Sequence, residues 1–267
     1  SPPFDEGYAT DFASGMMELL GEEDELQKCP MFTGNFEDRA YFISMDRICD
    51  ALLQKGWSFG IMPLGLNLNG LSVGHAEALS KSAAKVILPE VQAISDECAE
   101  ILCGTECQVE LWGLRNIPET ESHYSLVEKI ADYEDELMFD NLIEVSEKLA
   151  QHLFNVGKEK TGIWVGPALL SDTSLGILTR IQGYLSWGVR DLSDSQAELL
   201  CQHNADLSLD ELTSLSDRAA TLLSQFPYGL SLDLEKIPPS AAEILRSHPS
   251  FAESDEESDE EDWDDED

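Results

Sequence analysis

The segment LSLDELTSLSDRAATLL, from Leu207 to Leu223, decides the fold because its pattern recurs along the chain. Leu207 and Leu209 alternate as the inward face of a short strand does, and two further leucines continue the apolar positions through a turn. Ser216 followed by Asp217 provides a helix start, after which apolar residues recur at helical spacing. A unit of this size cannot bury its apolar side alone, so we expect it to stack on copies of itself.

Copies of this pattern occur before and after the segment. VILPEVQAISDECAEIL, which begins at Val86, matches it position for position, with Ser95 and Asp96 at the helix start. Longer intervals in the middle of the chain predict extended loops or helices between Ile117 and Glu136. Marked by the first apolar residue of the strand, the repeats are predicted to begin at Leu66, Val86, Val109, Leu137, Ile163, Leu185, Leu207 and Leu230, at intervals of 20 to 28 residues.

The pattern LxLxxLxxLSDxxAxxL resembles the leucine-rich-repeat family, in a short bacterial variety. The resemblance covers about Leu64 to Leu245 and implies a right-handed, curved α/β solenoid, with short parallel strands on the concave face and helices on the convex face. The chain departs from the commonest pattern because Asn69 and Asn141 do not form the usual ladder after the strands. A doubly wound sheet or a βα barrel is the rival fold, but its units commonly take about 30 or more residues.

Three regions are predicted along the chain. Residues 1–62 form an N-terminal lead-in and a capping helix, residues 63–250 form the solenoid of about eight repeats, and residues 251–267 form a disordered acidic tail. The capping helix, which is predicted to end at Gly56, follows from apolar residues at three- and four-residue spacing. These residues are Tyr41, Ile43, Ile48, Ala51, Leu52 and Trp57.

The charge of the chain is strongly negative, with 53 acidic and 16 basic residues and a formal net charge of −37. The segment from Glu253 to Asp267 holds 12 of the acidic residues and none of the basic ones, so the rest still carries −25. Such a field repels nucleic acid and anionic membranes and favours cationic partners. No apolar run is long enough to span a membrane and no signal peptide pattern opens the sequence, so we expect a cytoplasmic protein.

Nothing in the sequence points to catalysis. The motifs of nucleotide binding, zinc proteases, serine hydrolases and EF-hands are absent. The five histidines are spread singly, and we expect each at a surface or helix-side position. Cys98, Cys103 and Cys107 lack the paired spacing of common zinc sites, so we expect reduced, mostly buried thiols and leave a metal as the alternative for metal analysis to test. The expectation is therefore no enzyme, no cofactor and no metal.

Strand alternation predicts which side chains the concave face displays, because residues next to the inward markers point the other way. The middle of this face is aromatic and apolar, and its C-terminal part is small and acidic. Trp187 falls at an inward position and is expected in the core. The residues predicted to bind a partner are Ile87, Glu110, Trp112, Met138, Asp140, Trp164, Asp210 and Asp233.

Trp112 and Trp164 carry the functional hypothesis. A cleft centred on these tryptophans and bordered by acids would accept another protein with a basic or mixed surface. If the irregular middle repeats shift their register, the same tryptophans belong to the core instead. The leading hypothesis is a non-enzymatic protein-interaction module. The alternatives are an acidic inhibitor or chaperone of a basic, nucleic-acid-binding protein, and a structural subunit of a larger assembly in a salt-adapted organism.

Overall fold

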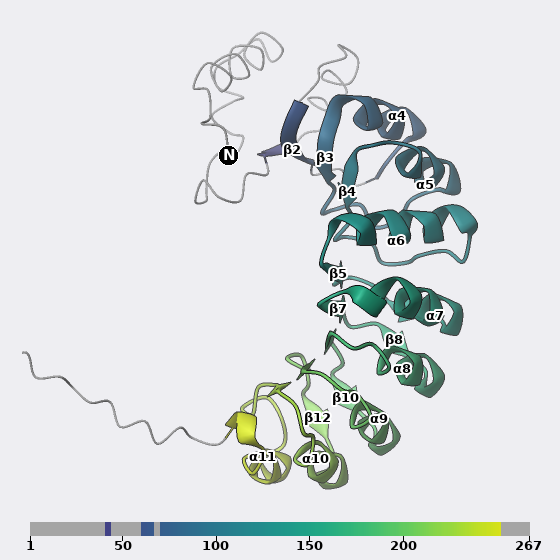
Figure 1. Cartoon of the computed structure of the whole chain (residues 1–267). Helices are drawn as coiled ribbons and strands as arrows, with labels where there is room; N and C mark the ends of the chain where they lie inside the picture. Colours follow the sequence, from purple (N-terminus) through teal and green to yellow (C-terminus); the bar gives the residue numbers. More distant parts are fainter. Residues whose placement is uncertain (1–40, 44–59, 67–69, 252–267) are drawn as a thin grey trace, which may run out of the picture.

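Short strands alternate with helices along the chain (Figure 1). The structure is a computed structural model, and it describes residues 41–43, 60–66 and 70–251. Its strands are β1 (Tyr41–Ile43), β2 (Gly60–Leu66), β3 (Ala83–Ile87), β4 (Gln108–Glu110), β5 (Glu136–Phe139), β6 (Glu144–Val145), β7 (Gly162–Val165), β8 (Leu169–Leu170), β9 (Tyr184–Trp187), β10 (Asp191–Leu192), β11 (Leu207–Ser208), β12 (Ser214–Leu215) and β13 (Leu230–Ser231). Its helices are α4 (Val73–Ser82), α5 (Asp96–Cys103), α6 (Glu121–Tyr133), α7 (Glu147–Val156), α8 (Asp172–Leu178), α9 (Asp194–Leu200), α10 (Asp217–Leu223) and α11 (Pro239–Leu245), with 3-10 turns η1 (Gly157–Glu159) and η2 (Pro249–Phe251).

The main strands form two parallel sheets whose order follows the chain. One sheet has the order β1-β2-β3-β4 and the other β5-β7-β9-β11-β13, while β6-β8 and β10-β12 form two small ladders in the turns. Within the described residues neither sheet closes on itself, so the fold is not a barrel. Within each of these two sheets, successive main strands lie side by side, unlike the rearranged strand order of a doubly wound sheet. The chain is therefore a mixed α/β protein built from parallel strands and helices.

The strand register confirms the marker positions from Val86 onward. Val86 pairs with Val109, and one continuous row contains Leu137, Ile163, Leu185, Leu207 and Leu230. The first marker is wrong by two residues, because Leu64 and not Leu66 lies opposite Val86. Leucines alternate at 64, 66 and 68, so a period of two alone does not choose between them.

The predicted capping helix is wrong where the structure describes it. Tyr41–Ile43 form β1, which pairs in parallel with Leu64–Leu66 as one more strand of the first sheet. Apolar residues two apart suit a strand as well as a helix, and here sheet pairing decides. The other residues of the predicted lead-in and cap up to residue 59, and the acidic tail from residue 252, lie outside the described residues.

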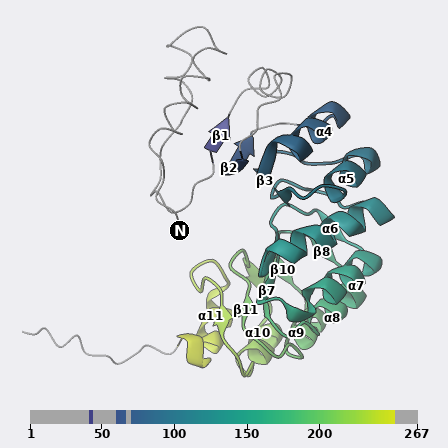
Figure 2. The same ribbon diagram turned by 45° about the horizontal axis from the view of Figure 1, so that its top comes forward.

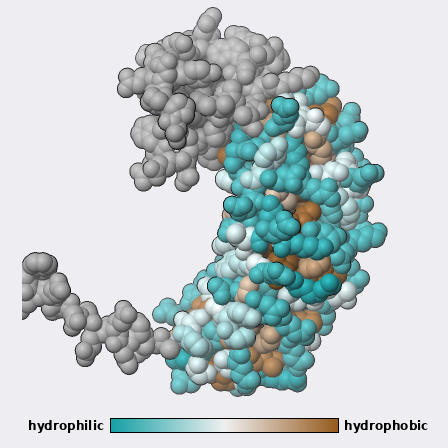
Figure 3. All heavy atoms as spheres, in the orientation of Figure 1, coloured by the Kyte–Doolittle hydropathy of each residue, from teal (hydrophilic) through white to brown (hydrophobic). Residues whose placement is uncertain are grey.

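The units are stacked in a curved row, with the main strands on the inner side and the helices on the outer side (Figures 1 and 2). The core lies between these two layers, where the seven markers from Val86 to Leu230 are each at most 4% exposed. Full burial of such a side chain contributes about 1.5–3 kcal/mol. The visible outer surface is mostly hydrophilic (Figure 3), as the composition requires of helices that face water.

Each helix from α5 to α10 begins at a hydroxyl side chain. This side chain accepts a hydrogen bond from the backbone N–H three residues later, which satisfies one of the free amides of the first turn. The Ser-Asp helix starts predicted at Ser95 and Ser216 are thereby confirmed. The capping residues are Ser95, Thr120, Ser146, Ser171, Ser193 and Ser216.

The middle of the stack is irregular, as the longer intervals predicted. Helix α6 fills the interval between Ile117 and Glu136 and is the longest described helix, with 13 residues. On its two sides β4 and β5 are end strands of the two sheets and do not pair with each other. Trp187 is buried, with 2% exposure, and its Nε1 donates to the carbonyl of Ala168 at 3.0 Å, which confirms its predicted place in the core.

Candidate functional site

The inner face displays its side chains in rows set by strand register. Residues one position after the markers point away from the core, as strand geometry requires. One row contains Met138, Trp164, Ser186, Ser208 and Ser231. In the first sheet Ile87 and Glu110 lie opposite each other in the same way. The alternation that predicted these positions is therefore correct for the side of the sheet.

The predicted residues differ in their exposure. Met138 is 41% exposed, Asp140 and Asp210 are exposed, and Trp112, Trp164 and Asp233 are half-buried. Ile87 and Glu110 differ from the expectation of a displayed surface, since they are 4% and 9% exposed. Neighbouring contacts cover them: Glu110 bears an ion pair with Lys85, and Ile87 lies beside Glu110 across the strand pair. Strand alternation predicts on which face of the sheet a side chain lies, but it does not predict how exposed that side chain is.

A cavity of about 140 Å³ lies where β4 and β5 face each other without pairing. We call it the inner cleft. Its apolar wall combines Trp112 and Met138 with core side chains, and its polar wall consists of carboxylates. The lining residues are Glu110, Leu111, Trp112, Ile130, Glu134, Glu136, Met138 and Phe139. Three of the predicted residues therefore meet in one place, together with two acids that the sequence reasoning missed.

A lysine of the chain itself lies at the polar wall. Lys85 Nζ contacts the Glu110 carboxylate and lies 3.3 Å from Glu134 Oε1. Burial raises the pKa of Glu110 above its ordinary value, and the attraction of Lys85 offsets this only in part. Burial lowers the pKa of Lys85, but the hydrogen bond and the charge of Glu110, with those of Glu134, raise it overall. Two of the three carboxylates of the inner cleft, Glu110 and Glu134, are thus arranged around a primary ammonium group.

Trp164 extends the aromatic surface by one strand. Its ring lies 5.3 Å from that of Tyr184, centroid to centroid, at a tilt of 48°. The buried Trp164 Nε1 has no hydrogen-bond partner in the part of the chain that the structure describes. Met138 is its register partner on β5, so the two side chains stand next to each other. The aromatic surface therefore runs from Trp112 past Met138 to Trp164.

The predicted aspartates of the C-terminal part bind polar side chains of the chain itself. Asp210 accepts hydrogen bonds from Ser208 Oγ at 2.6 Å and from Ser231 Oγ at 2.7 Å. Asp233 Oδ2 lies 3.7 Å from Lys236 Nζ. Desolvation raises the pKa of Asp140, which has no comparable partner among the described residues. Of these acids, Asp140 is the one nearest in sequence to the cleft residue Met138.

Three of the five histidines are buried, whereas each was expected at a surface or helix-side position; His75, His123 and His152 do lie on helices. His123, His203 and His248 are buried, and one ring nitrogen of each bonds to a backbone carbonyl of a preceding unit at 2.8 to 3.0 Å. The sequence does contain a signal for these buried positions, because His203 and His248 lie at the same distance from the ends of α9 and α11. Lys129 is another missed residue: it is buried and donates to the carbonyl of Leu102 at 2.6 Å.

The cysteines of the described region are free thiols. Cys98 and Cys107 are buried, and Cys103 is half-buried. Burial raises the pKa of Cys107 to about 11. Among the described residues no group of three His, Cys, Asp or Glu side chains is placed to hold a metal ion.

Comparisons of the chain with models of protein families, with curated proteins and with solved structures found no match. A search of the described helices for one long and apolar enough to cross a membrane found none.

Proposed function

We propose that this chain is a leucine-rich-repeat solenoid that acts as a non-enzymatic protein-interaction module in the cytoplasm. Support for the solenoid comes from the repeat pattern, the parallel register of the markers and the curved stack. In this proposal the inner face is the concave binding face, and the inner cleft accepts a lysine or arginine side chain of a partner protein. No cofactor or metal takes part.

The composition of the inner cleft carries the proposal. An alkyl chain packs on Trp112 and Met138, while its cationic head meets Glu134 and Glu136. Large side chains that enter such a pocket contribute about 2 kcal/mol or more to an interface. Lys85 supports this assignment from within the chain, because its ammonium group already contacts two of the lining carboxylates.

The net charge of −37 supports a basic or mixed partner surface and argues against direct nucleic-acid binding. Complementary charge speeds encounter and selects among partners more than it adds affinity. One observation favours a second candidate, an acidic inhibitor or chaperone of a basic, nucleic-acid-binding protein: residues 253–267 contain 12 acids and no base. If the chain is instead a structural subunit from a salt-adapted source, the other proteins of that source should be equally acidic.

A peptide titration tests the inner cleft. Fluorescein-labelled hexalysine is titrated with the full chain in about 0.15 M salt, where only charges within about 8 Å act strongly. We expect Trp112→Ala, and separately Glu134→Gln with Glu136→Gln, to weaken the fluorescence anisotropy isotherm about tenfold, which corresponds to about 1.4 kcal/mol.

Two matched controls separate the cleft from the general acidity. Glu211→Gln with Glu235→Gln removes the same charge from exposed sites near the C-terminal end, and Tyr228→Ala removes an exposed aromatic ring outside the cleft. Both controls should bind hexalysine as the unchanged chain does. If the cleft variants and the charge control lose the same affinity for hexalysine, the peptide binds through net charge alone, and the proposal would be wrong.

A further inference from the structure

A second surface feature lies in the turns that follow the main strands. Arg115, Ile143, Leu169 and Arg190 are exposed and occupy this turn in four successive units. Backbone hydrogen bonds join the first three of them, because Ile143 N–H donates to the Arg115 carbonyl at 2.9 Å and Leu169 N–H donates to the Ile143 carbonyl at 2.8 Å. We call these four residues the edge patch.

The apolar half of the edge patch is unusually open to water. Leu169 is 71% exposed and Ile143 is 50% exposed, and they are the two most exposed large apolar residues that the structure describes. The flanking units place polar residues at the same turn, namely Gln92 and Thr213, which bond to Arg115 and Arg190 through the backbone. Leu169 has Glu144 as its register partner, and Ile143 lies one position before that residue. Exposed apolar side chains on neighbouring turns, framed by polar ones, mark interaction surfaces.

The basic half of the edge patch is unusual for so acidic a chain. Neither Arg115 nor Arg190 makes a side-chain ion pair, hydrogen bond or ring contact within residues 70–251. Other exposed arginines have partners: Arg218 pairs with Glu198, Arg246 pairs with Glu243, and Arg180 lies over the ring of Phe154. With acids so abundant, an arginine without a carboxylate partner has its charge available to a ligand.

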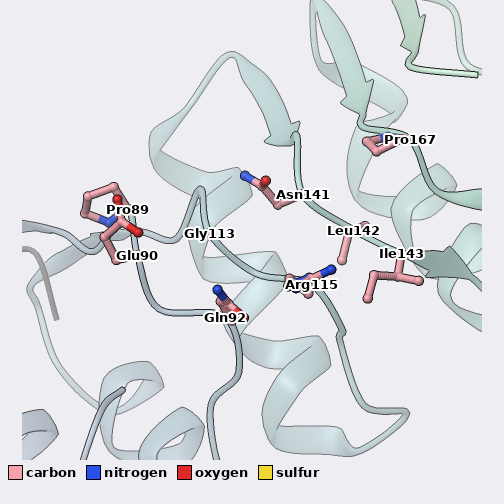
Figure 4. Close-up of a pocket in the computed structure, with 9 residues that line it drawn as sticks. All are labelled: Pro89, Glu90, Gln92, Gly113, Arg115, Asn141, Leu142, Ile143 and Pro167. Carbon is pink, nitrogen blue, oxygen red and sulfur yellow. The ribbon is translucent and has the colours of Figure 1, made fainter. Parts of the chain in front are cut away.

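A hollow of about 500 Å³ adjoins the Arg115 end of the edge patch. Figure 4 shows Arg115 between Gln92 and Ile143, with Asn141 above it and with Pro89 and Glu90 at the opposite side. Asn141 Nδ2 donates to the Trp112 carbonyl at 2.7 Å, which fixes the turn. The hollow therefore offers a guanidinium and the Gln92 amide next to an exposed aliphatic side chain.

We propose that the edge patch is a second docking surface, which binds a partner segment carrying a large apolar side chain next to one or a few carboxylates. The apolar side chain covers Ile143 and Leu169, and the carboxylates meet the free guanidinium groups. At physiological salt the screening length is about 8 Å, so the arginines act locally while the rest of the surface repels long acidic runs. A second copy of the chain is disfavoured, because both copies carry −37.

This surface is independent of the inner cleft, since its residues come from the turns and not from the inner face. The edge patch also binds negative charge, whereas the inner cleft binds positive charge. The chain would then present a cation-binding cleft and an anion-binding edge to one partner or to two.

A pair of labelled peptides tests the edge patch on the full chain. The probe is Glu-Glu-Leu-Trp-Glu-Glu, and its charge-reversed version has lysine in place of glutamate. We expect Arg115→Gln with Arg190→Gln, and separately Leu169→Ser, to weaken binding of the acidic probe about tenfold. Arg218→Gln removes a paired arginine and should leave binding unchanged. Circular dichroism of each variant verifies that it is folded.

Four results would overturn the proposal. The acidic probe fails to bind the unchanged chain, or it binds the edge variants as tightly as the control. The edge variants weaken the lysine peptide instead, which would assign a basic occupant. Removal of residues 253–267 raises the affinity for the acidic probe, which would identify that segment as the occupant in place of a separate partner. Trp112→Ala should leave the acidic probe unaffected, so failure of the inner cleft is seen separately.

Discussion

Two tryptophans on neighbouring strands should respond differently to replacement by phenylalanine. Trp187 is 2% exposed, and its Nε1 donates to the Ala168 carbonyl at 3.0 Å. Phenylalanine keeps most of the ring but leaves that carbonyl without its donor, so we expect Trp187→Phe to lower the free energy of unfolding by about 1–3 kcal/mol. Trp164 Nε1 is buried without a partner. Trp164→Phe removes an unsatisfied donor and should change stability by less than about 1 kcal/mol.

The stability of both variants is measured by urea unfolding followed by far-ultraviolet circular dichroism. Tryptophan fluorescence is unsuitable because each substitution removes one of the fluorescent residues. Both tryptophans belong to the sheet β5-β7-β9-β11-β13, so the midpoint of the unfolding transition of that half of the chain is compared. In Trp187→Phe this midpoint should fall well below that of Trp164→Phe, with similar slopes. If Trp187→Phe is as stable as Trp164→Phe, the hydrogen bond to Ala168 contributes nothing, and the reasoning from buried donors is refuted.

Further predictions concern three titratable residues. Lys129→Met removes the donor to the Leu102 carbonyl at the end of α5 and should cost about 2 kcal/mol in urea unfolding, whereas the exposed Lys148→Met should change little. Cys107, whose pKa burial raises to about 11, should react with iodoacetamide at pH 8 only after unfolding, as mass spectrometry of the labelled chain would reveal. Burial raises the pKa of Glu110 above 4.5, so folding takes up a proton there and this group lowers stability as pH rises through that window. Glu110→Gln should therefore flatten the pH dependence of the unfolding midpoint between pH 4.5 and neutrality; an unchanged slope would contradict the raised pKa.

The repeating part of the fold was predictable because its signals are local. Alternating leucines and a Ser-Asp helix start lie within one unit, and both are set by strand and cap geometry. The register of the first units was less predictable. Residues 41–43 and 60–66 acquire their register from pairing with other strands, and the alternation from Leu64 onward fits more than one register.

The inner cleft was predictable in part. Alternation placed Trp112 and Met138 on the right face, and the same rule applied two residues earlier gives Lys85 and Glu136. Glu134 was not accessible in this way, because it comes from the end of α6. The turns of the units align in the same way as the strands, and this alignment brings together Arg115 and Ile143 of the edge patch.

The interruption between β4 and β5 has a consequence for how the chain unfolds. Backbone ladders connect the units within each sheet, whereas across the interruption the connection consists of side-chain packing and a few turn bonds, such as that from Ile143 N–H to the Arg115 carbonyl. Among the described units the backbone ladder of the main strands is missing only there, so the two halves are expected to melt as separate cooperative units. An occupant of the inner cleft touches Trp112 in one half and Met138 in the other. Its binding free energy is therefore added to the coupling between halves, and a bound chain should melt in one step where the free chain melts in two.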